Sequence, residues 1–496
     1  MKILNRQTLF ESHDRDRALL KKSVWGGVST LVAQGVRMVL TMGSTAILAR
    51  LLTPSDYGLF GMVIVIVSFA QMFKEAGLSM ATVQKANISH NQISTLFWVN
   101  IFISVGLGLC ILAGAPLVAA FYGKSELTAV TAALSISFVL GGLAIQHKAL
   151  LRRHMRFGTL AGVQIANQIV SLAVTISLAL LGWKYWALVG GALILALSDV
   201  LLTFFFCRWI PGRIRKGTGA REMLLFGGHL TGFNFVNYFS RNADKILIGK
   251  FIGIDAVGIY TKAYQLFLMP IAQIRAPITQ VAMPVLSSLK DQPGRYVKYY
   301  QRIVDIMATL IVPLTLYCVI EADFIIGLLL GSQWDATIPV FRILAIAGLV
   351  QAVAGTRGMV LTSCGLSKRY FYWGLINAVV TVLSFGAGIP FGVEGVASAY
   401  AVANYLLLIP SLFYCFHETP VTVRVFMKTL IAPLVSAGVA AGCVFFMKKI
   451  WVGNSFWLSG LRLAVFAAIY GGLSISRKSI RETGALIFKG IVKKSD

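Results

Sequence analysis

The chain has 496 residues, of which 57% are hydrophobic and only 13% are charged, and its mean hydropathy is +0.76. Soluble domains are about half apolar and about a quarter charged, so this composition excludes an ordinary water-soluble protein. The formal net charge of +26 does not indicate a nucleic-acid partner, because the cations lie in short loops between apolar stretches rather than on one soluble face.

Apolar stretches of about 20 residues, each able to cross about 30 Å of hydrocarbon as a helix, recur along the whole chain. They follow a polar N-terminal tail, residues 1–22, that lacks the early apolar core of a cleavable signal peptide. We predict fourteen transmembrane helices, in chain order at Ser23–Leu48, Tyr57–Gly77, Leu96–Ala119, Leu127–Ile145, Leu160–Leu181, Tyr185–Cys207, Met223–Ile248, Ala256–Leu286, Ile303–Ile320, Ile338–Leu361, Phe371–Phe391, Val396–Phe416, Phe426–Met447 and Phe456–Ile475.

The loops between these spans alternate in charge. One side is rich in Lys and Arg, and the opposite side is nearly free of cations and includes Glu321 and Asp323, although Lys448 and Lys449 break the pattern. The positive-inside rule therefore predicts a multi-pass membrane protein with both termini in the cytoplasm. Tryptophans such as Trp209 lie close to predicted span ends, where we expect their rings at the headgroup boundary.

The chain also repeats itself. A shift of about 200 positions aligns Arg50 with Lys250 and Gly58 with Gly258, within a longer gap-free match. Both copies start from the cytoplasm, so the halves are parallel repeats. This organisation predicts, in order, the tail at 1–22, an N-lobe at 23–207, a cytoplasmic linker at 208–221, a C-lobe at 222–416, two extra helices at 417–476 and a cytoplasmic tail at 477–496.

Polar residues form stripes inside two equivalent spans. In the first span they follow a spacing of four and three, which places them on one helix face, and the seventh span repeats the pattern 200 positions later. An Arg at the bilayer centre costs about 2.5–3.5 kcal/mol, so two cationic stripes favour a wet, substrate-binding cavity over hydrogen-bonded seams inside each lobe. The stripes comprise Thr30, Gln34, Arg37, Thr41 and Ser44, and then Asn234, Asn237, Arg241 and Asp244, and Lys245 is a further candidate cation of the same cavity.

Other charged residues in the spans extend this candidate cationic site. Arg275 and Arg357 are further cavity cations, and Arg275 coincides in the repeat with Glu75, so the two are a candidate gate or else two independent interfacial residues. Arg462 is expected to extend from a span end to the interface. The candidate sites for a coupling Na⁺ or H⁺ are Asp199, Asp305 and Asp244, with local pairing of each acid as the alternative.

Several function classes are excluded by what the chain lacks. No loop has room for a nucleotide-binding domain, no phosphate-binding Gly-Lys-Ser/Thr loop is present, and we find no catalytic motif. We expect no metal site and no cofactor, and the six cysteines show no paired spacing. A secondary transporter, rather than an enzyme, fits this pattern. A membrane-embedded sugar ligase, the main enzyme alternative, would need a large extracytoplasmic loop.

Several motifs resemble the bacterial polysaccharide exporters of the multidrug/oligosaccharidyl-lipid/polysaccharide (MOP) superfamily, and most of all the colanic acid and lipopolysaccharide exporter branch. They are LLTPSDYG at Leu51–Gly58, FKEAGL at Phe73–Leu78, ALLRRHMRF at Ala149–Phe157, NADKILIGKFIGIDAVGIYTKAY at Asn242–Tyr264 and GSQW at Gly331–Trp334. The resemblance implies an all-α, MATE-like fold of two six-helix lobes plus two C-terminal helices.

The same resemblance implies a flippase that moves undecaprenyl-pyrophosphate-linked oligosaccharide by alternating access. Membrane lipids would be its partners, together with a polysaccharide polymerase and other assembly proteins. A peptidoglycan lipid-precursor flippase and a multidrug or metabolite antiporter of the same superfamily remain alternatives. Cationic stripes suit a pyrophosphate and argue against an exporter of cationic drugs.

Overall fold

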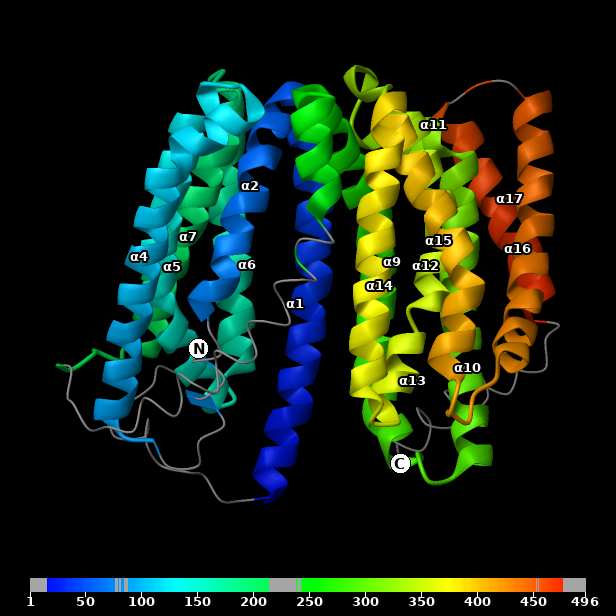
Figure 1. The fold of residues 1–496 in the computed structure, drawn as a ribbon, viewed down its shortest axis with the longest axis horizontal. Helices are drawn as coiled ribbons and strands as arrows, with labels where there is room; N and C mark the ends of the chain where they lie inside the picture. The colour runs from blue at the N-terminus through cyan, green and yellow to red at the C-terminus, as the bar shows by residue number, and fades with distance from the viewer. Residues whose placement is uncertain are drawn as a thin grey trace. The chain divides into compact units, whose positions relative to one another are not determined.

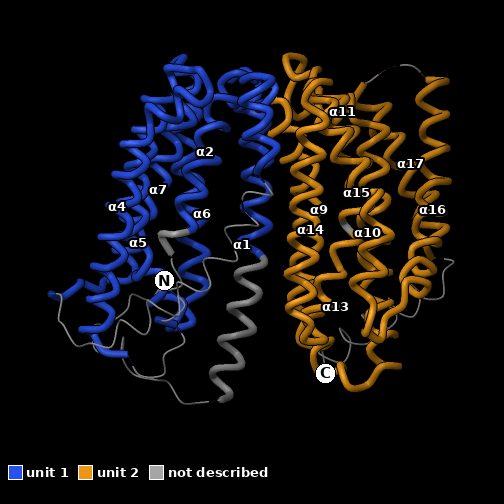
Figure 2. Tube along the Cα trace, in the orientation of Figure 1, with its two compact units in different colours: residues 1–258 blue, residues 259–496 orange. Residues whose placement is uncertain are grey.

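The computed structural model describes residues 16–75, 79, 82–83, 88–213, 238, 242–451, 453 and 455–475. Within these ranges all regular elements are helices (Figure 1). The chain divides into two compact units, residues 1–258 and residues 259–496 (Figure 2). The predicted lobe and linker boundaries are not tested by this division and stay predictions.

The described helices of unit 1 are long, and their ends follow local sequence signals. A reciprocal capping box begins α4, in which the Gln92 amide N–H donates to Ser89 Oγ (3.2 Å) and the Ser89 N–H donates to Gln92 Oε1 (3.0 Å). Gly123 ends the same helix with φ +68°, a conformation that favours glycine. The helices are α1 (Asp16–Leu51), α2 (Pro54–Glu75), α4 (His90–Tyr122), α5 (Glu126–Arg153), α6 (Phe157–Leu180) and α7 (Tyr185–Cys207).

Unit 2 takes in most of α9, whose first five residues belong to unit 1. Pro293 opens α10, at a position where its missing N–H has no partner to lose. The elements are α9 (Ile254–Ser288), α10 (Pro293–Ile320), α11 (Ala322–Leu329), η2 (Ser332–Trp334), α12 (Thr337–Ala354), α13 (Arg357–Ser363), α14 (Ser367–Gly388), η3 (Ile389–Phe391), α15 (Gly392–Phe416), α16 (Val423–Ile450) and α17 (Phe456–Ile475).

Eleven helical stretches are long and apolar enough to cross a membrane, and one of them, Ser367–Phe416, contains both α14 and α15. A helix lies at each predicted span except the seventh, most of which falls outside the described residues, so the count of fourteen is not confirmed. The predicted tenth span was wrong in one respect. It is not one continuous helix, because the chain breaks between α12 and α13 at Gly355 and Thr356.

The segment after α7 folds back onto unit 1. Trp209 is 2% exposed, so its ring is covered by protein, and its predicted position at the depth of the headgroups stays a prediction. Its indole Nε1 donates to His90 Nδ1 (3.2 Å), and three residues later the Gly212 N–H donates to Ser94 Oγ (2.9 Å) while Trp98 Nε1 donates to the Gly212 carbonyl (2.9 Å). The start of the predicted linker is therefore packed against α4.

The two C-terminal helices are part of the packing of unit 2. Ala440 and Val444 of α16 form one buried apolar cluster with Phe466 of α17, and Tyr317 of α10 packs against it. Burying these apolar groups favours a fixed position for α16 and α17 beside α10.

Candidate functional site

The first predicted stripe lies on α1, and only part of it reaches a neighbouring helix. The hydroxyls of Thr41 and Ser44 donate to carbonyls of their own helix, those of Arg37 (2.7 Å) and Thr41 (2.8 Å). Arg37 instead reaches α6, where its Nη1 donates to Gln164 Oε1 (3.0 Å). Both of these side chains are exposed, and Gln34 is half-buried. The stripe thus presents one accessible guanidinium, held by an amide of the adjacent helix.

A second polar group continues along α6. Asn167, one turn beyond Gln164, is buried and its Nδ2 donates to Asp199 Oδ1 of α7 (2.8 Å). The other carboxylate oxygen of Asp199 forms an ion pair with Lys148 of α5. Lys148 belongs to a different helix from Asp199, so the sequence alone did not indicate this ion pair. The carboxylate is therefore paired locally, which was the stated alternative to ion coupling.

The second predicted stripe cannot be compared in full. Asn234, Asn237 and Arg241 lie outside the described residues. Asp244 is 2% exposed and its Oδ1 accepts the N–H of Lys245 (2.8 Å), while Lys245 Nζ donates to Asn242 Oδ1 (3.4 Å). Whether this stripe and the first line one cavity stays a prediction.

In unit 2, Arg275 of α9 bonds to the backbone at the break between α12 and α13. At the break the N–H of Thr356 donates to the carbonyl of Val353, three residues earlier (3.0 Å). In a continuous α-helix it would donate to the carbonyl four residues earlier. The carbonyl of Gly355 accepts from Arg275 Nη2 (3.4 Å). A Cβ atom on Gly355 would lie 2.7 Å from the guanidinium carbon, so the absence of a side chain there lets Arg275 approach the backbone.

Arg357 begins α13, directly after the same break. Its guanidinium carbon lies 6.0 Å from the centre of the Trp373 ring, at the outer limit of a cation–π contact. Arg275 is near enough for the two positive charges to act on each other. The buried hydroxyl of Tyr300 bonds to Thr356 Oγ1 (2.8 Å) and fixes the break. The structure thus brings together two of the predicted cavity cations.

The remaining predicted residues are less informative. Asp305 is half-buried on α10. Glu75 is the last residue of α2, but its side chain is outside the described part of the chain. The Glu75–Arg275 gate therefore stays a prediction.

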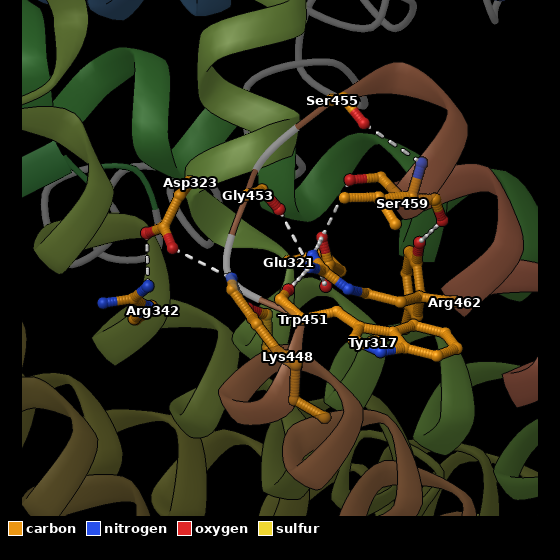
Figure 3. Close-up of polar contacts among 12 residues, drawn as sticks. Tyr317, Glu321, Asp323, Arg342, Lys448, Trp451, Gly453, Ser455, Ser459 and Arg462 are labelled. Carbon is orange, nitrogen blue, oxygen red and sulfur yellow. Dashed lines mark hydrogen bonds and ion pairs between the residues drawn. The ribbon is translucent and has the colours of Figure 1, made fainter.

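The structure also contains a charged cluster that sequence reasoning missed (Figure 3). Arg462 is 1% exposed and does not extend to the interface as expected, because its Nη1 bonds to the buried carboxylate of Glu321 (3.2 Å). Its Nη2 donates to the carbonyls of Trp451 and Gly453 (2.8 Å each), which fixes the turn between α16 and α17.

A second acid of the cluster explains an anomaly in the loop charges. Asp323 forms ion pairs with Arg342 of α12 and with Lys448 of α16, the latter at 2.9 Å (Figure 3). Lys448 is a cation on the side of the loops that otherwise has few, and the structure explains its presence there, since it neutralises the Asp323 carboxylate. That exception to the pattern, together with the two acids in one loop, was the available sequence signal.

Comparison with known proteins agrees with the resemblance to polysaccharide exporters. TuaB, the teichuronic acid biosynthesis protein of Bacillus subtilis (strain 168), is 25% identical over 455 residues, which cover 91% of this chain and 93% of TuaB. ExoT, the succinoglycan biosynthesis transport protein of Rhizobium meliloti (strain 1021), is 23% identical, and the match covers 73% of each chain.

Solved structures show the fold. The lipid II flippase MurJ in an inward closed conformation matches with a TM-score of 0.73 at 13% identity, over 91% of this chain and 98% of MurJ. An inward-facing MATE family multidrug resistance transporter of the MOP superfamily matches with a TM-score of 0.62 at 13% identity, over 80% of this chain and 96% of its own. The predicted all-helical, MATE-like membrane fold is thus confirmed.

A family model described as polysaccharide biosynthesis protein matches residues 47–339, which is more than half of the chain. The match begins at the end of α1 and includes the helices that contain Asp199 and Arg275. This membrane-spanning chain therefore belongs to the polysaccharide biosynthesis protein family.

Proposed function

We propose that this protein is a flippase that moves an undecaprenyl-pyrophosphate-linked oligosaccharide across the bacterial cytoplasmic membrane by alternating access. Its relatives are named for polysaccharide biosynthesis and transport, and MurJ, which shares the fold, is named a lipid II flippase. Both termini would be cytoplasmic, and a polysaccharide polymerase would receive the product. A peptidoglycan lipid precursor has the same carrier and pyrophosphate, so it is the alternative cargo.

One observation supports this function most directly. Arg37 and Arg357 lie in apolar helices, and within the part of the chain that the structure describes neither forms an ion pair. A cation inside a span needs water or an anion beside it. A pyrophosphate has at least two negative charges and accepts paired hydrogen bonds from a planar guanidinium. Such arginines suit this headgroup better than they suit a cationic drug.

An H⁺ or Na⁺ gradient would supply the driving force. Asp199, Asp305 and Asp244 are the candidate residues for a coupling cation, and at Asp199 that cation would have to replace Lys148. Flipping in proteoliposomes should then respond to at least one of the two gradients. Flipping that is indifferent to both would show facilitated diffusion instead.

The test of the site compares arginine variants in proteoliposomes loaded with the lipid-linked oligosaccharide. Arg37→Ala and Arg357→Ala should each weaken substrate affinity about ten- to a hundredfold, because one charged hydrogen bond is worth roughly 1.5–3 kcal/mol. Arg37→Lys should already weaken it, since the planar fork is lost. The exposed Arg424, on the first turn of α16, provides the control Arg424→Ala.

The same vesicles, loaded with lipid II or with a cationic dye, distinguish the alternative cargoes. Preference for lipid II would identify a peptidoglycan-precursor flippase, and export of the dye would identify an antiporter. Unchanged affinity in both alanine variants would contradict the assignment of the cationic site.

A further inference from the structure

Two contacts within unit 1 fix how α4 and α5 lie against each other. A Cβ atom on Gly142 of α5 would lie 2.4 Å from Ser104 Oγ of α4. Further along α5, the ring of His147 lies 5.9 Å from the ring of Phe97, which comes earlier on α4. Residue numbers rise on one helix as they fall on the other, so the helices are antiparallel. The helix faces between these two contacts therefore lie against each other.

The side chains between these contacts are polar and fully buried. Asn100 is one turn before Ser104 on α4, Gln146 is one turn after Gly142 on α5, and Asn100, Ser104 and Gln146 are each 0% exposed. Within the part of the chain that the structure describes, four of their polar atoms have no hydrogen-bond partner, namely Asn100 Nδ2 and Oδ1, Ser104 Oγ and Gln146 Nε2. Inside a membrane such atoms are costly unless something pairs with them.

Other hydroxyls of α4 are satisfied by their own helix. Ser94 and Thr95 donate to the carbonyls four residues before them, at 2.8 Å each. Ser104 Oγ makes no such bond and lies instead beside Gly142, where α5 has no side chain to cover it. The unpaired hydroxyl is therefore a feature of this position on α4 and not of the helix as a whole.

We propose that Asn100, Ser104 and Gln146 form a binding site for water, which joins α4 to α5 in place of direct bonds between their side chains. The mixture of groups identifies the occupant. The two amide nitrogens only donate, the amide oxygen of Asn100 only accepts, and the hydroxyl of Ser104 does both. Water both donates and accepts, and a buried water typically makes about three hydrogen bonds. A sodium ion would be repelled by the two amide N–H groups, and none of the three side chains carries a negative charge to hold it.

Polar contacts connect this site to the end of α5. Thr82 Oγ1 donates to Gln146 Oε1 (2.9 Å), so only the nitrogen end of this amide is left for the water. The carbonyl of Thr82 accepts from Nη1 of Arg153 (3.0 Å), the last residue of α5, whose side chain is half-buried. Water can therefore reach the site from the polar end of the helix along Arg153, Thr82 and Gln146, without crossing lipid.

The first test is the thermal stability of Asn100→Leu in detergent. Removing the amide should displace the water and leave Ser104 and Gln146 without partners, so the melting temperature should fall by several degrees. In a dry interface the same change would replace an unpaired amide with an apolar group of similar size and would not lower the melting temperature. Ser137→Ala is the control, because that buried hydroxyl already donates to the carbonyl of Leu134 (2.6 Å). A melting temperature of Asn100→Leu equal to or above that of the unchanged protein would overturn the proposal.

A second measurement detects the water directly. Solid-state NMR of isotope-labelled protein in lipid bilayers should show transfer of magnetisation from water to the side-chain amides of Asn100 and Gln146. Their signals are assigned by their loss in Asn100→Leu and Gln146→Leu. The backbone amide of Phe138, a residue of α5 that is 0% exposed, is the control and should receive none. Absence of transfer to both side-chain amides would overturn the proposal.

The dependence of stability on salt separates water from a bound cation. The melting temperature should be the same in NaCl and in KCl of equal concentration. A melting temperature that is higher in NaCl, and that loses this difference in Asn100→Leu, would assign a sodium ion to the site and overturn the proposal.

Discussion

The buried ion pair between Glu321 and Arg462 allows a quantitative prediction about the attachment of the last two helices. Glu321 follows α10, and Arg462 lies on α17, 141 positions further along the chain. Their side chains are 0% and 1% exposed. Ser459 Oγ also donates to the Glu321 carboxylate (3.3 Å). Replacing the glutamate would leave a guanidinium buried without its anion.

The expected cost follows from this geometry. Breaking a buried pair by removing one partner costs about 3–5 kcal/mol, so Glu321→Ala should lower the free energy of unfolding by about that amount. Glu321→Gln should cost less, because an amide oxygen still accepts from Arg462. The double variant Glu321→Leu and Arg462→Leu should recover part of the loss, but the carbonyls of Trp451 and Gly453 would lose their donor, at about 1–3 kcal/mol.

An exposed ion pair in the same unit is the control. Arg369 pairs with Glu418 at 3.2 Å, but the Glu418 side chain is 63% exposed. Such pairs contribute about 0–1 kcal/mol, so Glu418→Ala should change stability little. Denaturant titrations in detergent, followed by thiol labelling of Cys318, would measure each variant. A Glu321→Ala variant no less stable than Glu418→Ala would refute the assignment of a buried pair.

Two further predictions concern the candidate site. Gly355→Ala should displace Arg275, whose guanidinium carbon would lie 2.7 Å from the new Cβ, and should reduce substrate affinity about ten- to a hundredfold through the lost charged contact. Because the flexible side chain of Arg275 can move aside, the Gly355→Ala protein should be as thermally stable as the control Gly386→Ala, where nothing lies within 4 Å of a Cβ. A substrate affinity equal to that of the control would contradict a role of Arg275 in binding. Asp199→Asn should reduce the amount of folded protein, because Lys148 would lose its anion. The swapped variant Lys148→Asp with Asp199→Lys should restore that amount, measured as the area of the monodisperse peak in gel filtration. A swapped variant that folds but no longer responds to a proton gradient would instead assign the coupling proton to Asp199.

The positions of the helices could be predicted well because apolar length is a local property. A window of about 20 residues contains everything needed to recognise a span. The repeat is also visible in the sequence, where it aligns Gly58 with Gly258. Arg37 and Arg357 stood out for the same local reason, as cations within apolar stretches.

The break in the tenth span escaped prediction because its local signal is weak. The only proline of the predicted span, Pro339, is at its start, and the short stretch Gly355–Gly358 contains two glycines and Arg357 but does not by itself require the helix to end. The break is fixed by groups on other helices, the hydroxyl of Tyr300 and the guanidinium of Arg275.

The sequence by itself determined that the protein is a helical membrane protein, where most of its helices lie, and which charged residues they contain. Only the tertiary structure decided which of those charges are neutralised, as Lys148 with Asp199 and Glu321 with Arg462 show. The physical reason is that burial in lipid depends on the residues within one helix. The partner of a polar group depends on which faces of separate helices pack together, and many residues along the chain separate such partners.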